Sequence, residues 1–152
     1  MIRIMFAFLT ILLFSGCAPG TAVVRQNTET DRVRTEMLAS AAYANTDWLT
    51  SEKYYSELIR SGQQQALHWY RLGNIFAATN RPDAAIVAYR EAIRLQPDMA
   101  EAWYNLGIIQ LRQSAWSLGQ LQLHAGEDQA TAGQGKQILQ GILELIQTTG
   151  SK

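Results

Sequence analysis

Apolar residues recur at helical spacing in the middle of the chain. Two stretches show the rhythm of one helical face, Trp69, Leu72, Phe76 at i, i+3, i+7 and then Ala85, Tyr89, Ala92 at i, i+4, i+7. The turn Asn80-Arg81-Pro82-Asp83 separates them, since asparagine accepts the left-handed conformation after a helix and proline suits the first turn of the next. Pro97 ends the second stretch. The pattern predicts an antiparallel helical hairpin over Ala66–Met99.

The hairpin begins to repeat itself along the chain. Positions 69 and 103 are both Trp, 72 and 106 both Leu, and 73 and 107 both Gly, and the interval is the same for each pair. A period of about 34 residues is the mark of a repeat protein. With Phe76, Ala85, Tyr89, Ala92 and Pro97 between the copies, the segment Ala66–Met99 resembles a tetratricopeptide repeat. The resemblance implies an all-α fold, a short tetratricopeptide-like right-handed superhelix of antiparallel helical hairpins with a C-terminal capping helix. Its repeat core would comprise Trp69, Leu72, Gly73, Phe76, Ala85, Tyr89, Ala92, Pro97, Trp103, Leu106 and Gly107.

Weaker copies flank the clear repeat (66–99). A shift by the same interval aligns Leu38, Tyr55 and Ile59 with Leu72, Tyr89 and Ile93, so 29–62 is interpreted as a degenerate repeat. Its first helix would bury the side formed by Val33, Met37, Leu38, Ala41 and Ala42. Residues 100–126 form a partial repeat. They fit either two helices with a break near Ser114 or one helix from Met99 to His124, and the sequence leaves both open.

The C-terminal part combines a loop-like stretch with a very apolar helix. Gly126–Gly135 is rich in Gly and polar residues, which predicts a mobile loop. The segment 136–148 then carries six large aliphatic residues, which predicts a helix that buries most of its circumference: Ile138, Leu139, Ile142, Leu143, Leu145 and Ile146. Repeat arrays need a terminal element that covers the last core face, so we expect a cap helix. The alternative is a helix that docks into the protein's own groove or into a partner.

The N-terminus has the pattern of a targeting segment. Arg3 precedes the apolar run Ile4–Phe14, which is too short to span a membrane and fits the core of a signal peptide. Ser15-Gly16-Cys17 then resembles the lipobox of bacterial lipoproteins, although Phe14 stands where leucine is usual. The resemblance implies cleavage after residue 16 and lipidation of Cys17. Secretion after cleavage nearby and retention as an uncleaved anchor are the alternatives.

The lipobox resemblance also suggests an address and a domain order. Ala18 follows the cysteine, which in enterobacteria-like systems favours the outer membrane, here its periplasmic face. The predicted order is a signal peptide (1–16), a flexible lipidated tether (17–28) and a helical domain (29–148). The tether prediction depends on the polar, Pro- and Gly-containing run 18–28.

Composition and candidate chemistry argue against catalysis. The 13 basic and 13 acidic residues balance and form no basic run, so no nucleic-acid partner is expected. The lone cysteine cannot form an internal disulfide. His68 and His124 are expected at the surface, with no partners spaced for a catalytic triad or a metal site. No glycine-rich phosphate loop is present. We therefore expect no catalytic residue, no metal, no cofactor and no enzyme activity.

The resemblance instead implies a binding groove lined by the first helix of each repeat. Transferred residue by residue, the groove would contain Tyr70, Asn74, Ala77 and Ala78 from the clear repeat. The next repeat would add Glu101, Tyr104, Ile108, Leu111 and Arg112. Only Asn74 fits the carboxylate clamp of chaperone-type members, so that clamp is disfavoured. An apolar groove flanked by aromatic residues favours a helix or an extended peptide.

The predicted function is a membrane-anchored adaptor or scaffold of the bacterial cell envelope. It would bind a protein, as a peptide or helix of an envelope complex, and assist assembly of a secretion, pilus or outer-membrane complex. That step is an analogy from fold and address. One alternative is a self-associating structural lipoprotein, hence a homo-oligomer. The other is an accessory factor of a cell-wall enzyme.

Overall fold

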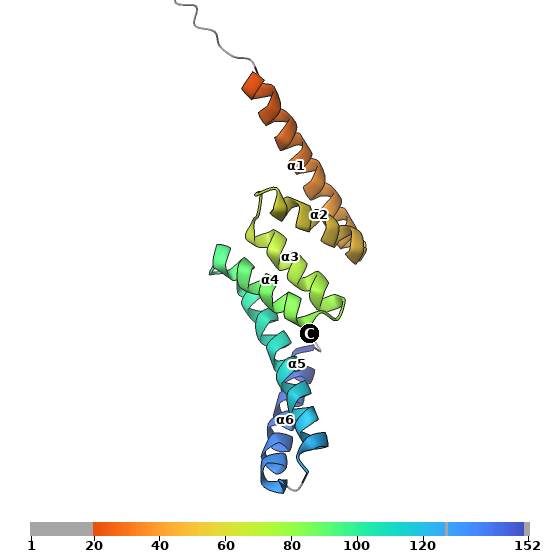
Figure 1. Cartoon of the computed structure of the whole chain (residues 1–152), viewed down its shortest axis with the longest axis vertical. Helices are drawn as coiled ribbons and strands as arrows, with labels where there is room; N and C mark the ends of the chain where they lie inside the picture. Colours follow the sequence, from red (N-terminus) through yellow and green to blue (C-terminus); the bar gives the residue numbers. More distant parts are fainter. Residues whose placement is uncertain (1–19, 127, 151–152) are drawn as a thin grey trace, which may run out of the picture.

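The computed structural model describes residues 20–126 and 128–150, and all regular structure in that part of the chain is helical. Helices follow one another as antiparallel neighbours from α1 at one end to the α5–α6 hairpin at the other (Figure 1). The prediction of an all-α fold is confirmed. The elements are α1 (Gly20–Ala44), α2 (Trp48–Arg60), α3 (Ala66–Ala78), α4 (Pro82–Leu95), α5 (Ala100–His124) and α6 (Gln129–Gly150).

The α1–α2 and α3–α4 hairpins have the same type of turn at equivalent positions of the repeat. Thr46 and Asn80, one repeat interval apart, both have positive φ, 56° and 57°. In the first turn the amide of Asp47 donates to the carbonyl of Ala42 at 2.9 Å. In the second turn the amide of Arg81 donates to the carbonyl of Phe76 at 2.8 Å. These bonds satisfy carbonyls that the helix end would leave without a partner. The two hairpins are therefore alike in geometry although their sequences differ.

Two clusters of buried side chains hold the hairpins together. One joins α1, α2, α3 and α4, and the other joins α4 to α5. Tyr55 and Tyr89 occupy the same repeat position, and each is buried in its cluster. Gly73 is needed beside Tyr89, since a Cβ added to Gly73 would lie 2.5 Å from the tyrosine ring. The first cluster is Ala39, Tyr55, Leu58, Leu72, Ile75 and Ala88, and the second is Ala85, Tyr89, Leu106 and Ile109.

The first helix differs from the prediction in its start and in its buried face. It begins at Gly20, so most of the stretch predicted as a flexible tether (17–28) is helical, while the signal peptide and Cys17 lie outside the described residues. Val33, Met37 and Leu38 were expected in the core but are exposed. The buried side carries Ala39 and Ala42, because small residues let α2 approach closely. The opposite face stays exposed because no described helix covers it.

The third repeat does not close into a hairpin within residues 100–126. Helix α5 is continuous, and the Ser114 hydroxyl donates to the Gln110 carbonyl within it at 2.9 Å instead of capping a new helix. No second helix therefore packs where α4 packs on α3. Gly107 has no atom within 4 Å of an added Cβ, and Trp103 is 54% exposed. This corrects the expectation that Trp103 and Gly107 are core residues like Trp69 and Gly73.

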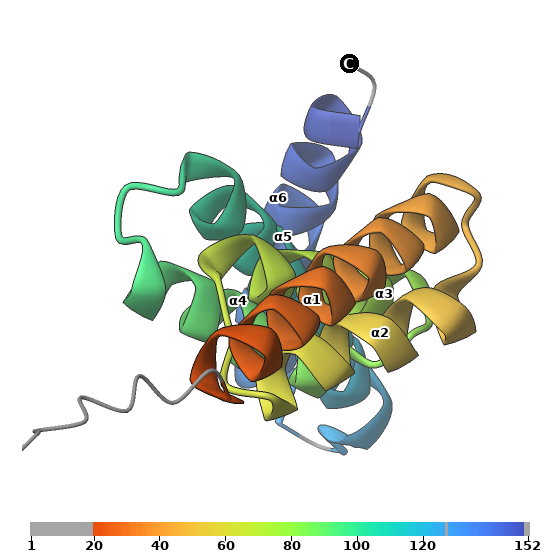
Figure 2. The same cartoon turned by 90° about the horizontal axis from the view of Figure 1, so that it is seen from above.

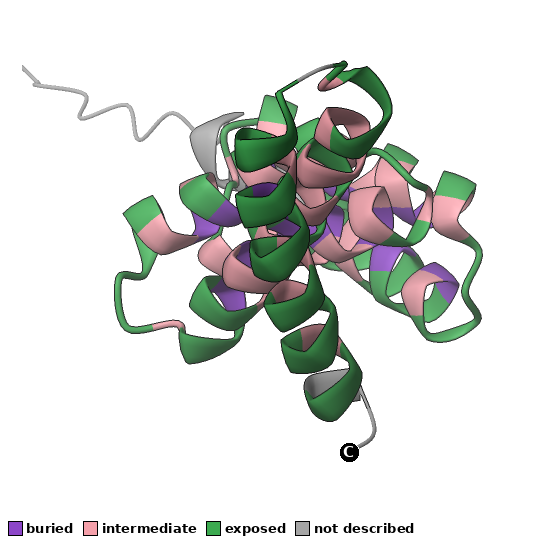
Figure 3. Cartoon of the chain, turned by 90° about the horizontal axis from the view of Figure 1, so that it is seen from below, coloured by how far each residue is buried: buried purple, intermediate pink, exposed green. Residues whose placement is uncertain are grey.

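The C-terminal helix also begins earlier than predicted. Most of the expected loop (126–135) is the first part of α6, where the Thr131 amide donates to the Asp128 carboxylate at 3.1 Å as an N-terminal cap. The bond to Thr131 lowers the pKa of Asp128. Ile138, Leu143 and Leu145 are exposed, so α6 buries one stripe and not most of its circumference; Figure 3 shows how much of it is exposed. None of the described helices combines the length and the apolar character that crossing a membrane requires.

His68 lies in the core and not at the surface, which corrects the sequence prediction. Its side chain is fully buried between Tyr55, at a ring distance of 5.8 Å, and Glu36, whose carboxylate is 3.6 Å from Nε2. Neither ring nitrogen has a hydrogen-bond partner among the described residues. His124 is exposed, as predicted.

Replacing His68 with phenylalanine should therefore leave stability almost unchanged. The phenylalanine ring is one atom larger, which crowds the buried site, but it removes two buried nitrogens that lack hydrogen-bond partners. The two effects should nearly offset, so the free energy of unfolding should change by less than ~1 kcal/mol. Chemical denaturation checks this, with Leu72→Ala as the comparison, since emptying that buried site should cost ~2–5 kcal/mol. A loss for His68→Phe as large as for Leu72→Ala would mean that the imidazole makes an essential polar contact.

Candidate partner-binding groove

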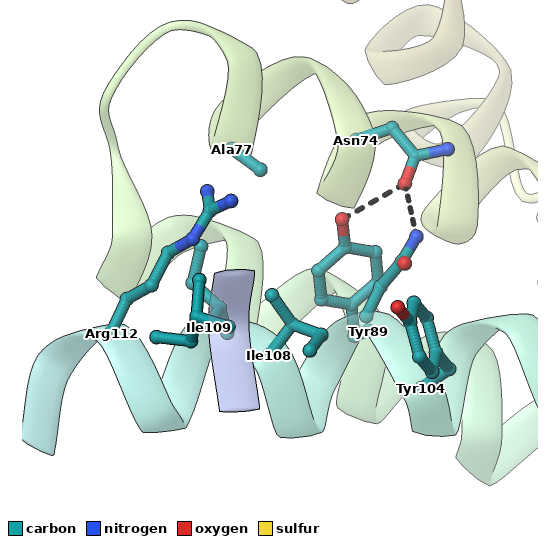
Figure 4. Close-up of a pocket in the computed structure, with 9 residues that line it drawn as sticks. Asn74, Ala77, Tyr89, Tyr104, Ile108, Ile109 and Arg112 are labelled. Atoms are coloured by element: carbon teal, nitrogen blue, oxygen red, sulfur yellow. Dashed lines mark hydrogen bonds between the residues drawn. The ribbon is translucent and has the colours of Figure 1, made fainter. Parts of the chain in front are cut away.

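A pocket of about 330 Å³ opens where α3, α4 and α5 meet, on the side predicted to form the groove (Figure 4). Tyr104 and Ile108 project from successive turns of α5, while Asn74 and Ala77 face them from α3. The end of α6 contributes Ile146 to the same pocket. The lining residues are Asn74, Ala77, Tyr89, Tyr104, Asn105, Ile108, Ile109, Arg112 and Ile146.

The polar floor of the pocket is a hydrogen-bonded network centred on Asn74. Its amide nitrogen donates to the Tyr43 hydroxyl at 2.9 Å. Its carbonyl oxygen accepts from the Tyr89 hydroxyl and from the Asn105 amide, both at 2.9 Å (Figure 4). The Asn105 amide also reaches the Tyr70 hydroxyl at 3.4 Å. One asparagine thus links α1, α3, α4 and α5, which makes Asn74 a structural residue of the groove.

Burial extends the neutral form of the Tyr89 phenol to higher pH. Loss of solvent is the largest cause that raises the pKa of Tyr89 well above its usual range, and the nearby Tyr70 and Tyr43 phenols raise it further. Burial likewise raises the pKa of Tyr55, which occupies the same position one repeat earlier. The Tyr89 hydroxyl thus stays the donor of its bond to Asn74 over a wide pH range.

Arg112 is the charged residue of the pocket lining. Its side chain is exposed, and within the described part of the chain it makes no ion pair with a carboxylate. By contrast, Arg71 covers the Tyr43 ring at 4.2 Å, and Arg81 is held by Glu52. The pocket therefore presents an apolar wall with a positive charge at its rim.

A second hollow of about 510 Å³ continues from the first along α5. The two share Ala77, Ile109 and Arg112. The second hollow ends at Trp116, which is 69% exposed. Two of its lining residues are joined by a hydrogen bond of 2.6 Å from the Gln113 amide to the Asp83 carboxylate. We call the two hollows together the groove. The groove runs from Tyr104 to Trp116.

Five of the nine residues predicted to line the groove meet in it. Asn74, Ala77, Tyr104, Ile108 and Arg112 line the first pocket. The other four, Tyr70, Ala78, Glu101 and Leu111, do not line either hollow, although Tyr70 contacts the network through Asn105. Sequence reasoning missed four residues that line the first pocket. Asn105 and Ile109 lie on α5 beside the predicted positions, whereas Tyr89 lies on α4 and Ile146 on α6.

The end of α6 lies at the groove and not over the open face of α5. Ile146 shares the pocket with Asn74 of α3 and Ile108 of α5. The face of α5 that carries Gly107 remains uncovered. Figure 2 shows α6 projecting beside α5 and away from the α1–α2 hairpin. Among the described helices α6 packs on α5, as a cap helix would, and its end reaches the groove through Ile146.

Comparison with known proteins agrees with the hairpin geometry. Residues 63–114, about a third of the chain, match the family model described as TPR repeat. The chain is similar to the peroxisomal targeting signal receptors of two fungi. That of Candida glabrata is 33% identical over 66 residues, which are 43% of this chain and 11% of the receptor. That of Eremothecium gossypii is 31% identical over 111 residues, which are 68% of this chain and 20% of the receptor.

The chain thus spans a fifth or less of the length of the curated relatives it matches. What it shares with them is a tetratricopeptide repeat segment, and the prediction of a tetratricopeptide-like helical fold is confirmed. Such repeats are protein-interaction modules, so the chain has a role in protein–protein interaction.

Proposed function

We propose that this protein is a lipid-anchored adaptor of a bacterial cell envelope. In this role it holds a partner protein in its groove at the periplasmic face of the outer membrane, and it assists assembly of a secretion, pilus or outer-membrane complex. The observation that carries the binding part is the groove itself, with exposed Tyr104 and Trp116, an apolar wall and the Arg112 charge. The anchor rests on the run Met1–Cys17, which lies outside the described residues.

The relatives support recognition of a protein segment and not a location. They are named as receptors of a targeting signal, which is consistent with a repeat groove that takes a peptide. The similarity covers a fifth or less of those proteins, so we transfer only the binding of a protein segment.

The anchor is tested by metabolic labelling with a radioactive fatty acid in a bacterial host. We expect the wild-type chain to incorporate the label and to fractionate with the outer membrane, and the Cys17→Ser variant to do neither. Equal labelling of both chains, or no labelling of the wild type, would remove the lipoprotein part of the proposal and leave the groove unaffected.

The adaptor role is tested by photocrosslinking in the native envelope. A photoreactive residue replaces Tyr104, which is 54% exposed in the groove. The matched control replaces Val87, which is 58% exposed on α4 and lines neither hollow. A crosslink to a secretion, pilus or outer-membrane component from position 104 alone supports the proposal. Equal crosslinks from both positions, or none from either, would contradict it.

Self-association is a second candidate that a specific observation favours. The α5–α6 hairpin exposes several large apolar side chains, Trp103, Trp116, Leu123, Ile138 and Leu145. Exposed apolar side chains that cluster on one part of a molecule commonly mark interaction surfaces. Light scattering over a range of concentrations separates the candidates, since a strict monomer removes this one.

A further inference from the structure

We propose that α6, which packs along α5 and reaches the groove through Ile146, is displaceable, and that an amphipathic helix of a partner takes its place. The partner helix would carry aliphatic residues at the spacing of Leu139, Ile142 and Ile146 and a carboxylate that meets Arg112. The inference deepens the proposed function and rests on the proposal that the groove binds a partner.

Helix α6 contacts the rest of the fold along one stripe of side chains. Five residues alternate in steps of three and four and are buried or half-buried: Ala132, Gly135, Leu139, Ile142 and Ile146. At one end Gly135 lies so near α5 that an added Cβ would be 2.5 Å from a Leu121 methyl group. At the other end Ile146 enters the pocket. The stripe shows that the side of α5 accepts an aliphatic helical face, which reaches the groove at Ile146.

Several features weaken the attachment of α6. Two glycines inside the helix, Gly133 and Gly141, have no atom within 4 Å of an added Cβ, so no close packing requires them. Glycine inside a helix lowers its stability relative to alanine. Ile138 and Leu145, more than half exposed, add little burial. The helix packs on α5 and is joined to it by a short turn in which Gly126 has a φ of 54°.

Arg112 gives a partner helix an advantage over α6. In the described part of the chain this guanidinium has no carboxylate partner. The one acidic residue near the end of α6, Glu144, accepts a bond from Gln140 of the same helix at 3.3 Å. A partner helix with the same aliphatic stripe and a carboxylate at the groove rim would gain an ion pair that α6 does not make. This difference in charge favours displacement.

The test uses a fluorescent peptide with the sequence of residues 129–150, in which both unpacked glycines are alanine. The protein is the mature chain 17–152 with Cys17→Ser, which contains the whole described fold. We expect Ile146→Asp to expel α6 from the pocket. Fluorescence anisotropy should then show that the Ile146→Asp chain binds the peptide at least tenfold more tightly than the parent chain does. Ile138→Asp is the matched control, the same change at an exposed α6 position outside the pocket, and should stay within twofold.

A second variant keeps the test valid if Ile146→Asp fails to fold. Gly133→Ala with Gly141→Ala should strengthen α6 in the protein, slow its amide hydrogen exchange at least fivefold, and weaken peptide binding severalfold. Unchanged exchange and binding in this variant would overturn the proposal. So would equal binding of the peptide to the Ile146→Asp and Ile138→Asp chains. If Ile146→Asp dimerises instead of binding the peptide, the site belongs to α6 of a second copy, and the partner assignment is wrong.

The carboxylate is tested on the peptide. Leu143 and Leu145 lie on opposite flanks of the inward stripe, so each is replaced by glutamate in turn. One of the two peptides should bind at least threefold more tightly, and the gain should disappear on Arg112→Gln. No gain from either peptide would overturn the charge requirement. Because this assay needs no envelope partner, its failure is distinct from a failed crosslink at position 104.

Discussion

Replacing Gly73 with leucine will lower the free energy of unfolding by more than ~3 kcal/mol, and replacing it with alanine by ~1–3 kcal/mol. The reason is the contact between α3 and α4. A Cβ at Gly73 would lie 2.5 Å from two ring carbons of Tyr89. That ring is 2% exposed, and its hydroxyl is held by Asn74, so it cannot move aside cheaply. Urea denaturation followed by circular dichroism measures the loss.

Gly107 provides the matched control for this prediction. It stands at the same position of the next repeat, yet no atom lies within 4 Å of an added Cβ. Gly107→Ala should therefore stabilise the chain by roughly 0.5–1 kcal/mol, since alanine is the better helix former. Equal effects of the two substitutions would contradict the close packing at Gly73. A smaller loss for Gly73→Ala in a Tyr89→Leu background would identify the ring as the cause.

The clear repeat was predictable because its signals are local. Gly73 and Tyr89 are complementary in size, and the turn between their helices contains Asn80, which does adopt positive φ, followed by Pro82. The end of the third repeat lacks such a signal. Ser114 stands one repeat interval after Asn80 and remains inside α5. With no residue there that favours positive φ, the helix continues, and the hairpin that the repeat pattern suggests does not form.

The position of α6 could not be read from local composition. The glycines of 126–135 suggested a loop, but Gly135 is buried inside a helix, where it allows close approach to Leu121. The six aliphatic residues of 136–148 suggested burial all round, whereas Ile138, Leu143 and Leu145 are exposed and the stripe with Leu139, Ile142 and Ile146 is half-buried. Both errors concern contacts with α5, and the sequence of α6 alone does not specify which face that neighbour covers. Ile146 was missed as a groove residue for the same reason.

Asn74→Leu is expected to lower the free energy of unfolding by about 2–3 kcal/mol. Asn74 makes three hydrogen bonds of 2.9 Å that join four helices. Its loss leaves the Tyr89 hydroxyl without that acceptor in a nearly fully buried position. A buried group without a partner costs ~1–3 kcal/mol, which is more than the net value of one bond. Gln110→Leu, the same kind of change at an exposed position of α5, should cost less than ~0.5 kcal/mol.

A double-mutant cycle separates the network from simple packing. Tyr89→Phe alone should cost ~1 kcal/mol, because it removes one donor and keeps the ring against Gly73. In the Asn74→Leu background the same change should cost nothing or should stabilise, because it removes the hydroxyl that lost its partner. The cycle should therefore show a coupling of ~1 kcal/mol or more. Strictly additive losses would mean that the two side chains stabilise the groove independently, and the floor of the pocket would then be held by packing alone.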